Sequence, residues 1–436
     1  MEPQQVYAVL QENGLGVSDV TPFAQMSEAA GGMLTGDSIL FVDGFDRALK
    51  IPDKGYPGMS LQKTESEKAI RGSNEGFGDS IKQNTALIRK RLRSVDLKVA
   101  ECKCGRRTGT NVDIMYLDGI VRPEIVTQMQ QRMAAFEIDG IGDSGVIEQL
   151  TETQWFSPFP QYQTTRRPDR AVMALLEGRA VLLADNSPEV LIFPTDYNSF
   201  IKTTDDYYTR WEIATFTRTL RYVAAFLSMI LPGLYLAMTN FHTQLLPTKL
   251  LLSFAAARQG VPFPGVVEVL LMELSFELLR EAGVRLPGAM GNTIGIVGGL
   301  IIGQAAVDAN IVSPMVVIVV AFTALCSFAI PNEDFATAFR LLKFAFIGLA
   351  AALGFYGFLL GILVLLIHLA QLESFGVPYL MPVVGAELSG YKDAQDTLMR
   401  PPMWSLHRRP IYAKRNNRIR LRIKKQGKNT NTDREK

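Results

Sequence analysis

The chain has 436 residues, 47% of them hydrophobic, and a formal net charge of +2. Its three cysteines are too few for a disulfide-stapled scaffold, and no histidine or second cysteine pair stands at zinc-ligand spacing. The small net charge hides a division of the chain. Residues 1–215 mix charged and apolar residues as soluble domains do, residues 219–372 are apolar, and residues 392–436 are strongly basic. Residues 1–15 have neither the basic nor the apolar region of a cleavable signal, so none is predicted.

An internal repeat is visible in the first part of the chain. Leu34 aligns with Leu176 and Ile51 with Phe193, a constant spacing of 142 residues. Each copy has a Leu-x-Gly start, a short apolar strand, a turn containing Asp, and a second apolar strand, which is a β-hairpin pattern. The sequence therefore predicts two tandem α/β subdomains.

The two copies differ in completeness. The second, residues 94–215, has predicted strands over 97–102 and 112–117, and predicted helices over 123–136, 146–151 and 169–177 before its hairpin. In the first, residues 1–54, the opening strands and helix would fall before Met1, so either the true start lies upstream or this part has been lost. Residues 55–93 between them are predicted to be a linker, and their stretch Gly72–Gly78 lacks the Lys-Ser/Thr ending of a phosphate loop.

Residues 216–380 are predicted to form a transmembrane helical domain. A bilayer core needs about 20 apolar residues in a helix. Four segments qualify, over 220–241, 293–312, 313–330 and 339–372. The last is too long for one untilted span, so it is either one bent helix or two helices broken near Gly354 and Gly357. The second is rich in Gly and Ala, which favours close helix packing.

A fifth apolar stretch, residues 266–285, carries acidic residues. Glu273, Glu277 and Glu281 share one helix face, because they are spaced by four. They are candidates for a cation path; alternatively they pair with Arg258, Arg280 or Arg285 in a helix that lies in the interface, inside the bundle or towards water. Because four spans already place both chain ends on one side, this stretch is expected not to cross the membrane fully.

Other residues of this domain are candidates for weaker roles. Asp308, four residues after Gln304, is either part of an ion path or a polar helix end. Proline in a membrane helix frees carbonyl groups and bends the helix. Pro232, Pro262 and Pro264, together with Gly354 and Gly357, are therefore candidates for gating hinges or for static bends.

The basic tail, residues 381–436, fixes the expected orientation. It holds ten Lys and Arg residues from Arg400 to Lys425, and Arg210, Arg218 and Arg221 precede the first span. The positive-inside bias places both termini in the cytoplasm. Without a folded nucleic-acid-binding module, the tail is expected to contact anionic lipid headgroups and no nucleic acid.

Several motifs resemble one family over nearly the whole chain. These motifs are NTALIRKRLR at 84–93, GRRTGT at 105–110, SPFPQ at 157–161, RPD at 167–169, PTKLLLS at 247–253, AAARQGVPFP at 255–264, MELSFELLREAG at 272–283, GQAAV at 303–307, SFGVPY at 374–379, RPPMW at 400–404 and RP at 409–410. They are similar to those of the GerA-type spore germinant receptor A subunits, and the paralogous SpoVAF-type proteins share them. Family members carry additional residues that complete the first subdomain.

The resemblance implies a multi-pass protein of the spore inner membrane. It implies an α+β fold with two cytoplasmic α/β subdomains and an α-helical transmembrane bundle. It further implies a homo-oligomer, a pentamer, that acts as a ligand-gated cation channel with a transporter-like B subunit and a lipoprotein C subunit. No enzyme activity, catalytic residue, metal or cofactor is expected. A non-conducting scaffold and a SpoVAF-type accessory channel are the alternatives, and a secondary transporter would show inverted repeats in the membrane half.

Overall fold

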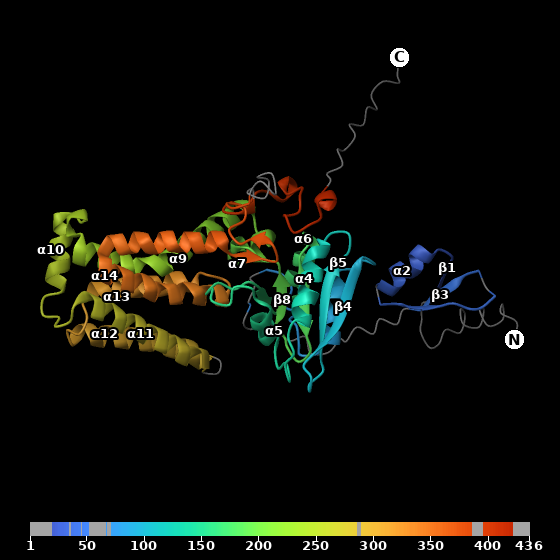
Figure 1. Ribbon diagram of the computed structural model, residues 1–436, viewed down its shortest axis with the longest axis horizontal. Coiled ribbons are helices and arrows are strands. Elements are labelled where there is room, and N and C mark those ends of the chain that lie inside the picture. The colour runs from blue at the N-terminus through green and yellow to red at the C-terminus, as the bar shows by residue number, and fades with distance from the viewer. Residues whose placement is uncertain are drawn as a thin grey trace, which may run out of the picture.

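The computed structural model describes residues 20–34, 36–44, 46–51, 67, 71–285, 289–385 and 396–421. In Figure 1 the described chain forms three parts: a small α/β unit, a larger α/β domain and a bundle of long helices. Most of residues 52–70 of the predicted linker, and Arg422, Lys424 and Lys425 of the tail, lie outside the described residues.

The small unit is the first repeat copy. It consists of β1 (Thr21–Phe23), α2 (Met26–Leu34), β2 (Ser38–Leu40) and β3 (Ala48–Ile51), with strand order β1-β3-β2. Ala29, Ala48 and Leu49 are buried in it. The predicted hairpin is the antiparallel pair β2 and β3.

The second copy repeats this unit strand for strand. Its elements are β6 (Gln163–Thr165), α6 (Pro168–Glu177), β7 (Ala180–Ala184) and β8 (Val190–Phe193). Thr21 pairs with Lys50 in the first copy and Gln163 pairs with Ile192 in the second, so both partners are displaced by the same 142 positions. The repeat predicted from the sequence is therefore confirmed down to strand register.

The second copy is extended into a five-stranded antiparallel sheet of order β4-β5-β7-β8-β6. The added strands are β4 (Leu97–Cys104) and β5 (Thr110–Leu117). One face is covered by α4 (Pro123–Ala134) and α5 (Ser144–Thr151), which pack on Val112 and Ile114. The other is covered by α3 (Ile81–Arg91) and α6, which pack on Met115. Both faces are buried because alternate side chains of each strand point to opposite sides.

Short helices α7 (Tyr197–Ile201) and α8 (Asp205–Tyr208) lead from the α/β domain into the bundle. The long helices are α9 (Trp211–Leu236), α11 (Gly265–Arg285), α12 (Ala289–Asp308), α13 (Pro314–Phe328) and α14 (Glu333–Gln371). Helix α9 continues in a π turn, Ala237–Phe241, and α10 (Thr248–Ala257) lies at the end of the bundle away from the α/β domain (Figure 1). We call that end the outer end, and the end that contacts the α/β domain the foot.

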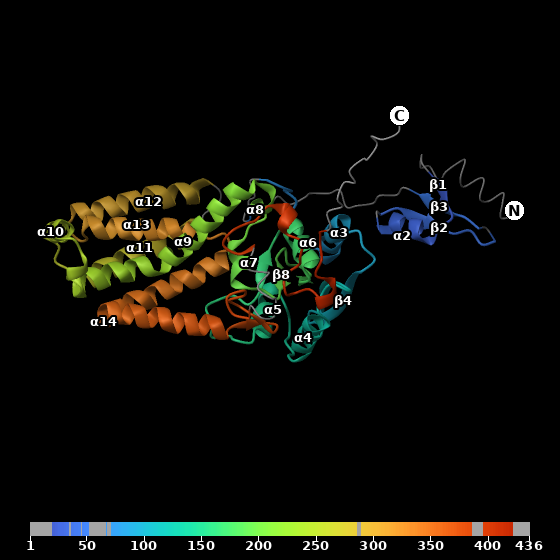
Figure 2. The same ribbon diagram turned by 90° about the horizontal axis from the view of Figure 1, so that it is seen from above.

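Helix α14 is two helices. Gly354 has φ 61° and ψ −137°, a conformation that only glycine adopts readily, and it interrupts the helical backbone. Figure 2 shows two segments that meet at the outer end. The ring of Phe159, in the α/β domain, lies near both Phe339 of the first segment and His368 of the second, so the segments are antiparallel. Of the two alternatives left by the sequence, the break at Gly354 is the one observed.

Two described helices are long and apolar enough to cross a membrane, Trp211–Phe241 and Glu333–Gln371. They contain the first and fourth expected spans. The second and third expected spans form α12 and α13, of 20 and 15 residues. In α12, Gly298 and Gly299 face Leu279 and Phe276 of α11, as expected of a packing surface built from small residues.

Candidate functional site

Helix α11 carries an acidic row into the bundle. Glu273 and Lys343 are 1% and 4% exposed, and Glu273 Oε2 lies 2.5 Å from Lys343 Nζ. The same ammonium group lies 3.1 Å from Glu277 Oε1. Lys343 comes from the first segment of α14, and Glu273 and Glu277 face it because they are one helical turn apart. One cation is thus shared by two carboxylates.

The row continues in both directions as ion pairs and hydrogen bonds. Towards the outer end, the buried Glu268 lies 3.2 Å from Arg258 and accepts a hydrogen bond from the Ser313 amide. Towards the foot, Arg340 lies 4.0 Å from Glu277 and 3.0 Å from Glu333. Arg280 Nη1 donates to Ser327 Oγ at 2.9 Å. We call this set of paired groups along α11 the polar seam: Arg258, Glu268, Glu273, Glu277, Arg280, Glu333, Arg340 and Lys343.

Two sequence candidates lie outside the polar seam. Glu281 is exposed and pairs with Arg285 at 2.6 Å, one turn along the same helix. Asp308 is exposed at the end of α12 and accepts a hydrogen bond from Gln304 at 2.9 Å. The structure therefore brings Glu273 and Glu277 together and leaves Glu281 and Asp308 apart from them.

Helix α11 takes one of the three positions that the sequence left open. Glu268 contacts Ser313 at the start of α13, and Arg280 contacts Ser327 at its end. Helix α11 therefore runs beside α13 from the start of that helix to its end, inside the bundle. Basic and hydroxyl groups from α13, α14 and the loop before α11 pair with the charged side chains of α11. This pairing offsets the free-energy cost of burying those charges among apolar helices.

The candidate hinge residues have different settings. Pro232 is buried inside α9, whose helix continues through it. Pro262 and Pro264 lie in the loop before α11, and the Pro264 carbonyl accepts from the Val267 and Glu268 amides at the start of that helix. A Cβ on Gly357 would lie 2.2 Å from the Leu349 carbonyl oxygen, so this glycine allows the two α14 segments to touch.

A buried ion cluster ties the foot of α9 to the rest of the chain. Arg218 is fully buried and pairs with Asp206 at 3.2 Å and with Asp396 at 2.7 Å. Asp396 also pairs with Lys202 and accepts from Tyr207. Burial acts to raise the pKa of Asp396, but Lys202 and Arg218 hold it below its ordinary value. This carboxylate is therefore charged at neutral pH and links α9 to the α/β domain.

Aromatic rings form the rest of that junction. Phe159 and Phe200 of the α/β domain contact Phe335 at the start of α14, and Phe159 and Phe200 also contact Tyr379 beyond its end. Ser157 and His368 add a hydrogen bond of 2.9 Å. The α/β domain thus contacts both ends of the α14 hairpin.

The C-terminal segment 396–421 is folded onto the α/β domain, although the sequence predicts a lipid-binding tail. The Lys414 amide donates to the Ile120 carbonyl and Arg409 donates to the Leu176 carbonyl, each at 2.7 Å. Arg179 lies over the ring of Tyr412 at 4.4 Å. The segment contributes main-chain and aromatic groups to a protein surface, so its basic composition did not reveal where it lies.

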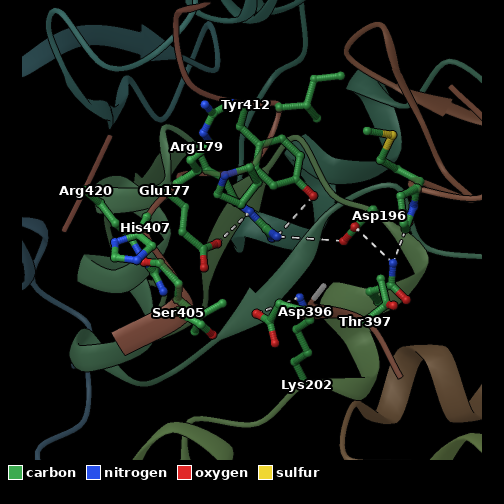
Figure 3. Close-up of a pocket in the computed structure, with 17 residues that line it drawn as sticks. Glu177, Arg179, Asp196, Lys202, Asp396, Thr397, Ser405, His407, Tyr412 and Arg420 are labelled. Atoms are coloured by element: carbon green, nitrogen blue, oxygen red, sulfur yellow. Dashed lines mark hydrogen bonds and ion pairs between the residues drawn. The ribbon is translucent and has the colours of Figure 1, made fainter. Parts of the chain in front are cut away.

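A cavity of about 280 Å³ lies between this segment and the α/β domain (Figure 3). Arg179 points into the middle of it, where its guanidinium approaches Glu177 at 3.5 Å, Asp196 at 3.8 Å and the Tyr412 hydroxyl at 3.2 Å. Lys202, Asp396, His407 and Arg420 line its rim. The acidic and basic side chains that line the cavity already pair with one another. The cavity is therefore part of a polar contact between the C-terminal segment and the α/β domain.

Over the residues that the structure describes, no group of three or more His, Cys, Asp or Glu side chains is placed to hold a metal ion. Cys102 and Cys104 lie on β4 and form no disulfide bond. The described residues therefore provide ion pairs between apolar helices and a tight contact between the α/β domain and the foot of the bundle.

Comparison with known proteins assigns the chain to a family. The profile of the Bacillus/Clostridium GerA spore germination proteins matches residues 2–412. The chain belongs to the GerA family.

Relatives in the GerA family match most of this chain and are themselves longer. Spore germination protein KA of Bacillus subtilis is 43% identical over 388 residues, which are 89% of this chain and 71% of the relative. Spore germination protein GerLA of Bacillus cereus is 38% identical over 94% of this chain and 84% of its own length. The B. subtilis membrane protein YfkQ is 40% identical over 93% of this chain and 79% of its own.

A solved structure also matches this GerA-family chain. It is the crystal structure of the N-terminal domain of the A subunit of the Bacillus megaterium spore germinant receptor GerK3. The match covers 44% of this chain and 68% of that domain, with 31% identity and a TM-score of 0.34. The family profile and the curated relatives confirm the resemblance inferred from the sequence motifs at the level of the family of spore germination A subunits.

Proposed function

We propose that this chain is the A subunit of a nutrient germinant receptor, and that it is a multi-pass protein of the spore inner membrane. Family membership supports the spore germination role. The two long apolar helices, Trp211–Phe241 and Glu333–Gln371, support the membrane position. The proposed partners are a transporter-like B subunit and a lipoprotein C subunit, with which the A subunit assembles.

The direction of each helix supports six passages. Helix α9 leaves the foot, where Arg218 is held, and ends at Phe241. Phe241 lies against Gly354 at the turn of the α14 hairpin, so both mark the outer end. Helices α11 and α13 both run from the outer end towards the foot. Helix α12, which lies between them in the sequence, runs in the opposite direction. The two α14 segments complete six passages, which leaves both chain ends on the cytoplasmic side.

The polar seam is the observation that supports a role in cation conduction. Charged groups in the interior of a membrane bundle are costly and are retained for ion or proton pathways more often than for stability. The side chain of Glu277 is 29% exposed while that of Glu273 is 2% exposed. In a ring of subunits, a pentamer, the partly open Glu277 faces the axis as a carboxylate ring that favours cations, while Glu273 anchors Lys343.

The test compares three Glu→Gln substitutions in spores. Glu277→Gln is expected to slow the release of monovalent cations after nutrient addition, with an unchanged amount of A subunit by immunoblot. Glu273→Gln should lower the amount of protein, because Lys343 loses its closest partner. Glu212→Gln, at the exposed start of α9, is the matched control and should behave as wild type.

One result favours the alternative of a non-conducting scaffold. If cation release is unaltered in both seam variants at wild-type protein level, the bundle only anchors its partners. A SpoVAF-type accessory channel would instead show slower release in the variants while nutrient recognition by the remaining receptors persists.

A further inference from the structure

All three tryptophans of the chain are exposed and lie near the foot of the bundle. Trp155 is 80% exposed, Trp211 is 44% exposed and Trp404 is 64% exposed. Trp155 lies in the loop between α5 and β6, Trp211 is the first residue of α9, and Trp404 lies in the short turn Met403–Ser405. Tryptophan is rare on the surface of soluble domains and enriched at the boundary between lipid and water.

The loop around Trp155 is rigidly attached to the end of α14. Gln154 Nε2 donates to the Gln371 carbonyl at 3.4 Å, and Ser157 Oγ lies 2.9 Å from His368 Nε2. Phe159, two residues on, is buried among the aromatic rings of the junction. Trp155 and its neighbour Phe156, 85% exposed, nevertheless point outward with their rings edge to face at 5.7 Å. Their exposure is therefore built into the fold.

The apolar surfaces of two helices end at the same level. On the second segment of α14 the large exposed aliphatic residues end just before His368, which contacts the Trp155 loop; they are Leu359, Leu360, Leu363, Val364, Leu366 and Ile367. On α9 an exposed stripe of one face begins two residues after Trp211; it consists of Ile213, Phe216, Leu220 and Val223. The tryptophans thus mark where the surface changes from apolar to polar.

We propose that the loop Gln154–Pro158 inserts Trp155 and Phe156 into the headgroup region of the bilayer that surrounds the bundle, which docks the α/β domain on the membrane surface. The inference rests on the proposed membrane position of the bundle. The stretch Thr151–Pro160 contains Glu152 and no Lys or Arg, so the surface it fits is the lipid boundary itself rather than anionic headgroups. Contact with the lipid then adds to the contacts with α9 and α14 that already hold the domain beside the bundle.

The test uses the single-tryptophan variant Trp211→Phe/Trp404→Phe, which leaves Trp155 as the only tryptophan. The full chain is reconstituted in phosphatidylcholine vesicles whose acyl chains carry bromine near the headgroup or near the terminal methyl group. Bromine quenches indole on contact, so it reports depth. We expect the shallow bromine to remove most of the Trp155 emission, the deep bromine to remove little, and phosphatidylglycerol to change neither result.

A matched control places the tryptophan elsewhere. Val95 is exposed in the loop before β4. Figure 1 shows β4 on the side of the α/β domain away from the long helices. In a chain with all three tryptophans replaced by Phe, Val95→Trp should be quenched by neither lipid. A second variant, Trp155→Ser/Phe156→Ser, should still float with vesicles but expose the α/β domain to faster proteolysis.

The outcomes separate this inference from the proposed function. Chains that fail to float with the vesicles overturn the membrane position itself. If the chains float but the emission of Trp155 is not quenched, the loop does not contact lipid and the docking is overturned. The same conclusion holds if the loop is covered by a protein partner instead. Quenching that appears only with phosphatidylglycerol would likewise overturn it, because it would show attraction by charge.

Discussion

At the scale of single residues, Lys343 is the group on which the polar seam depends. It is nearly fully buried and lies within hydrogen-bond distance of two carboxylates from the neighbouring helix. A buried charge is stable only when it is paired. The acidic spacing of Glu273 and Glu277 was evident in the sequence, but their partner is 70 and 66 positions away and could not be identified from spacing.

Lys343→Met should strongly destabilise the protein, because it leaves Glu273 buried without a cation. Breaking a buried pair from one side costs about 3–5 kcal/mol. Thermal unfolding of the full chain in detergent measures the loss. Arg285→Met, which removes the exposed partner of Glu281, is the control and should cost about 0–1 kcal/mol. Equal stability of the two variants would contradict the interior role of the seam.

Glu148 of α5 should make stability depend on pH. Burial, then the charges of Glu152 and Asp334, raise its pKa to about 8. The folded chain therefore keeps the proton to a higher pH than the unfolded chain does, so rising pH favours unfolding between the usual glutamate pKa and about 8. Above about pH 8 the full loss of folding stability caused by ionisation of Glu148 remains. Below the usual glutamate pKa this loss disappears.

The variant Glu148→Gln isolates this effect. Its melting temperature in detergent should exceed that of the wild type at about pH 9 and approach it at about pH 5. Glu137→Gln, at an exposed position after α4, is the control and should follow the wild type at both values. Parallel pH profiles for Glu148→Gln and the wild type would show that the carboxyl ionises freely in the fold.

At the scale of elements, the α14 hairpin depends on one glycine. Gly354 has a positive φ, and a Cβ there would lie 2.8 Å from Cγ of Phe241. Gly354→Ala should therefore lower the yield of folded protein, at a cost of about 1–3 kcal/mol from backbone strain alone. Gly348→Ala is the matched control, since a Cβ at Gly348 meets nothing within 4 Å and alanine favours helix. Folded yield on detergent gel filtration decides between them, and equal yields would argue for one continuous helix.

Elements with a local signal were predictable, and those fixed by distant partners were not. Strands β4 and β5, the hairpins of both repeat copies and a possible break near Gly354 were predictable because alternation, turn residues and excess length are encoded locally. The pairing of α11 with Lys343 of α14 and the ion cluster of Arg218 were missed. Both depend on residues far away in the chain, and a charged apolar stretch alone fits several positions.

At the scale of the whole molecule, the C-terminal segment closes the structure onto itself. Gly178, with φ 94°, ends α6, and a Cβ there would lie 2.8 Å from the main chain of Ala413. Only glycine allows this approach. The segment thus holds the α/β domain, while its Asp396 holds α9.

Gly178→Val should release this segment from the α/β domain. Limited trypsin digestion should then cut between Arg408 and Arg420 much faster than in the wild type. Gly142→Val is the control, because a Cβ at Gly142 meets nothing within 4 Å. Unchanged cleavage in Gly178→Val would mean that the segment is held by contacts other than the close approach to Ala413.

The proposed six passages of the bundle through the membrane, with the α/β domain on one side, can be tested directly by labelling. Single cysteines, placed at Ser94, Ser253 and Val284 in a chain with its three native cysteines changed to Ser, can be labelled in sealed vesicles with a membrane-impermeant maleimide. We expect Ser94→Cys and Val284→Cys to be labelled from the same side of the membrane and Ser253→Cys only from the other. Labelling of Val284→Cys from the same side as Ser253→Cys would show that α11 does not cross and would rule out six passages.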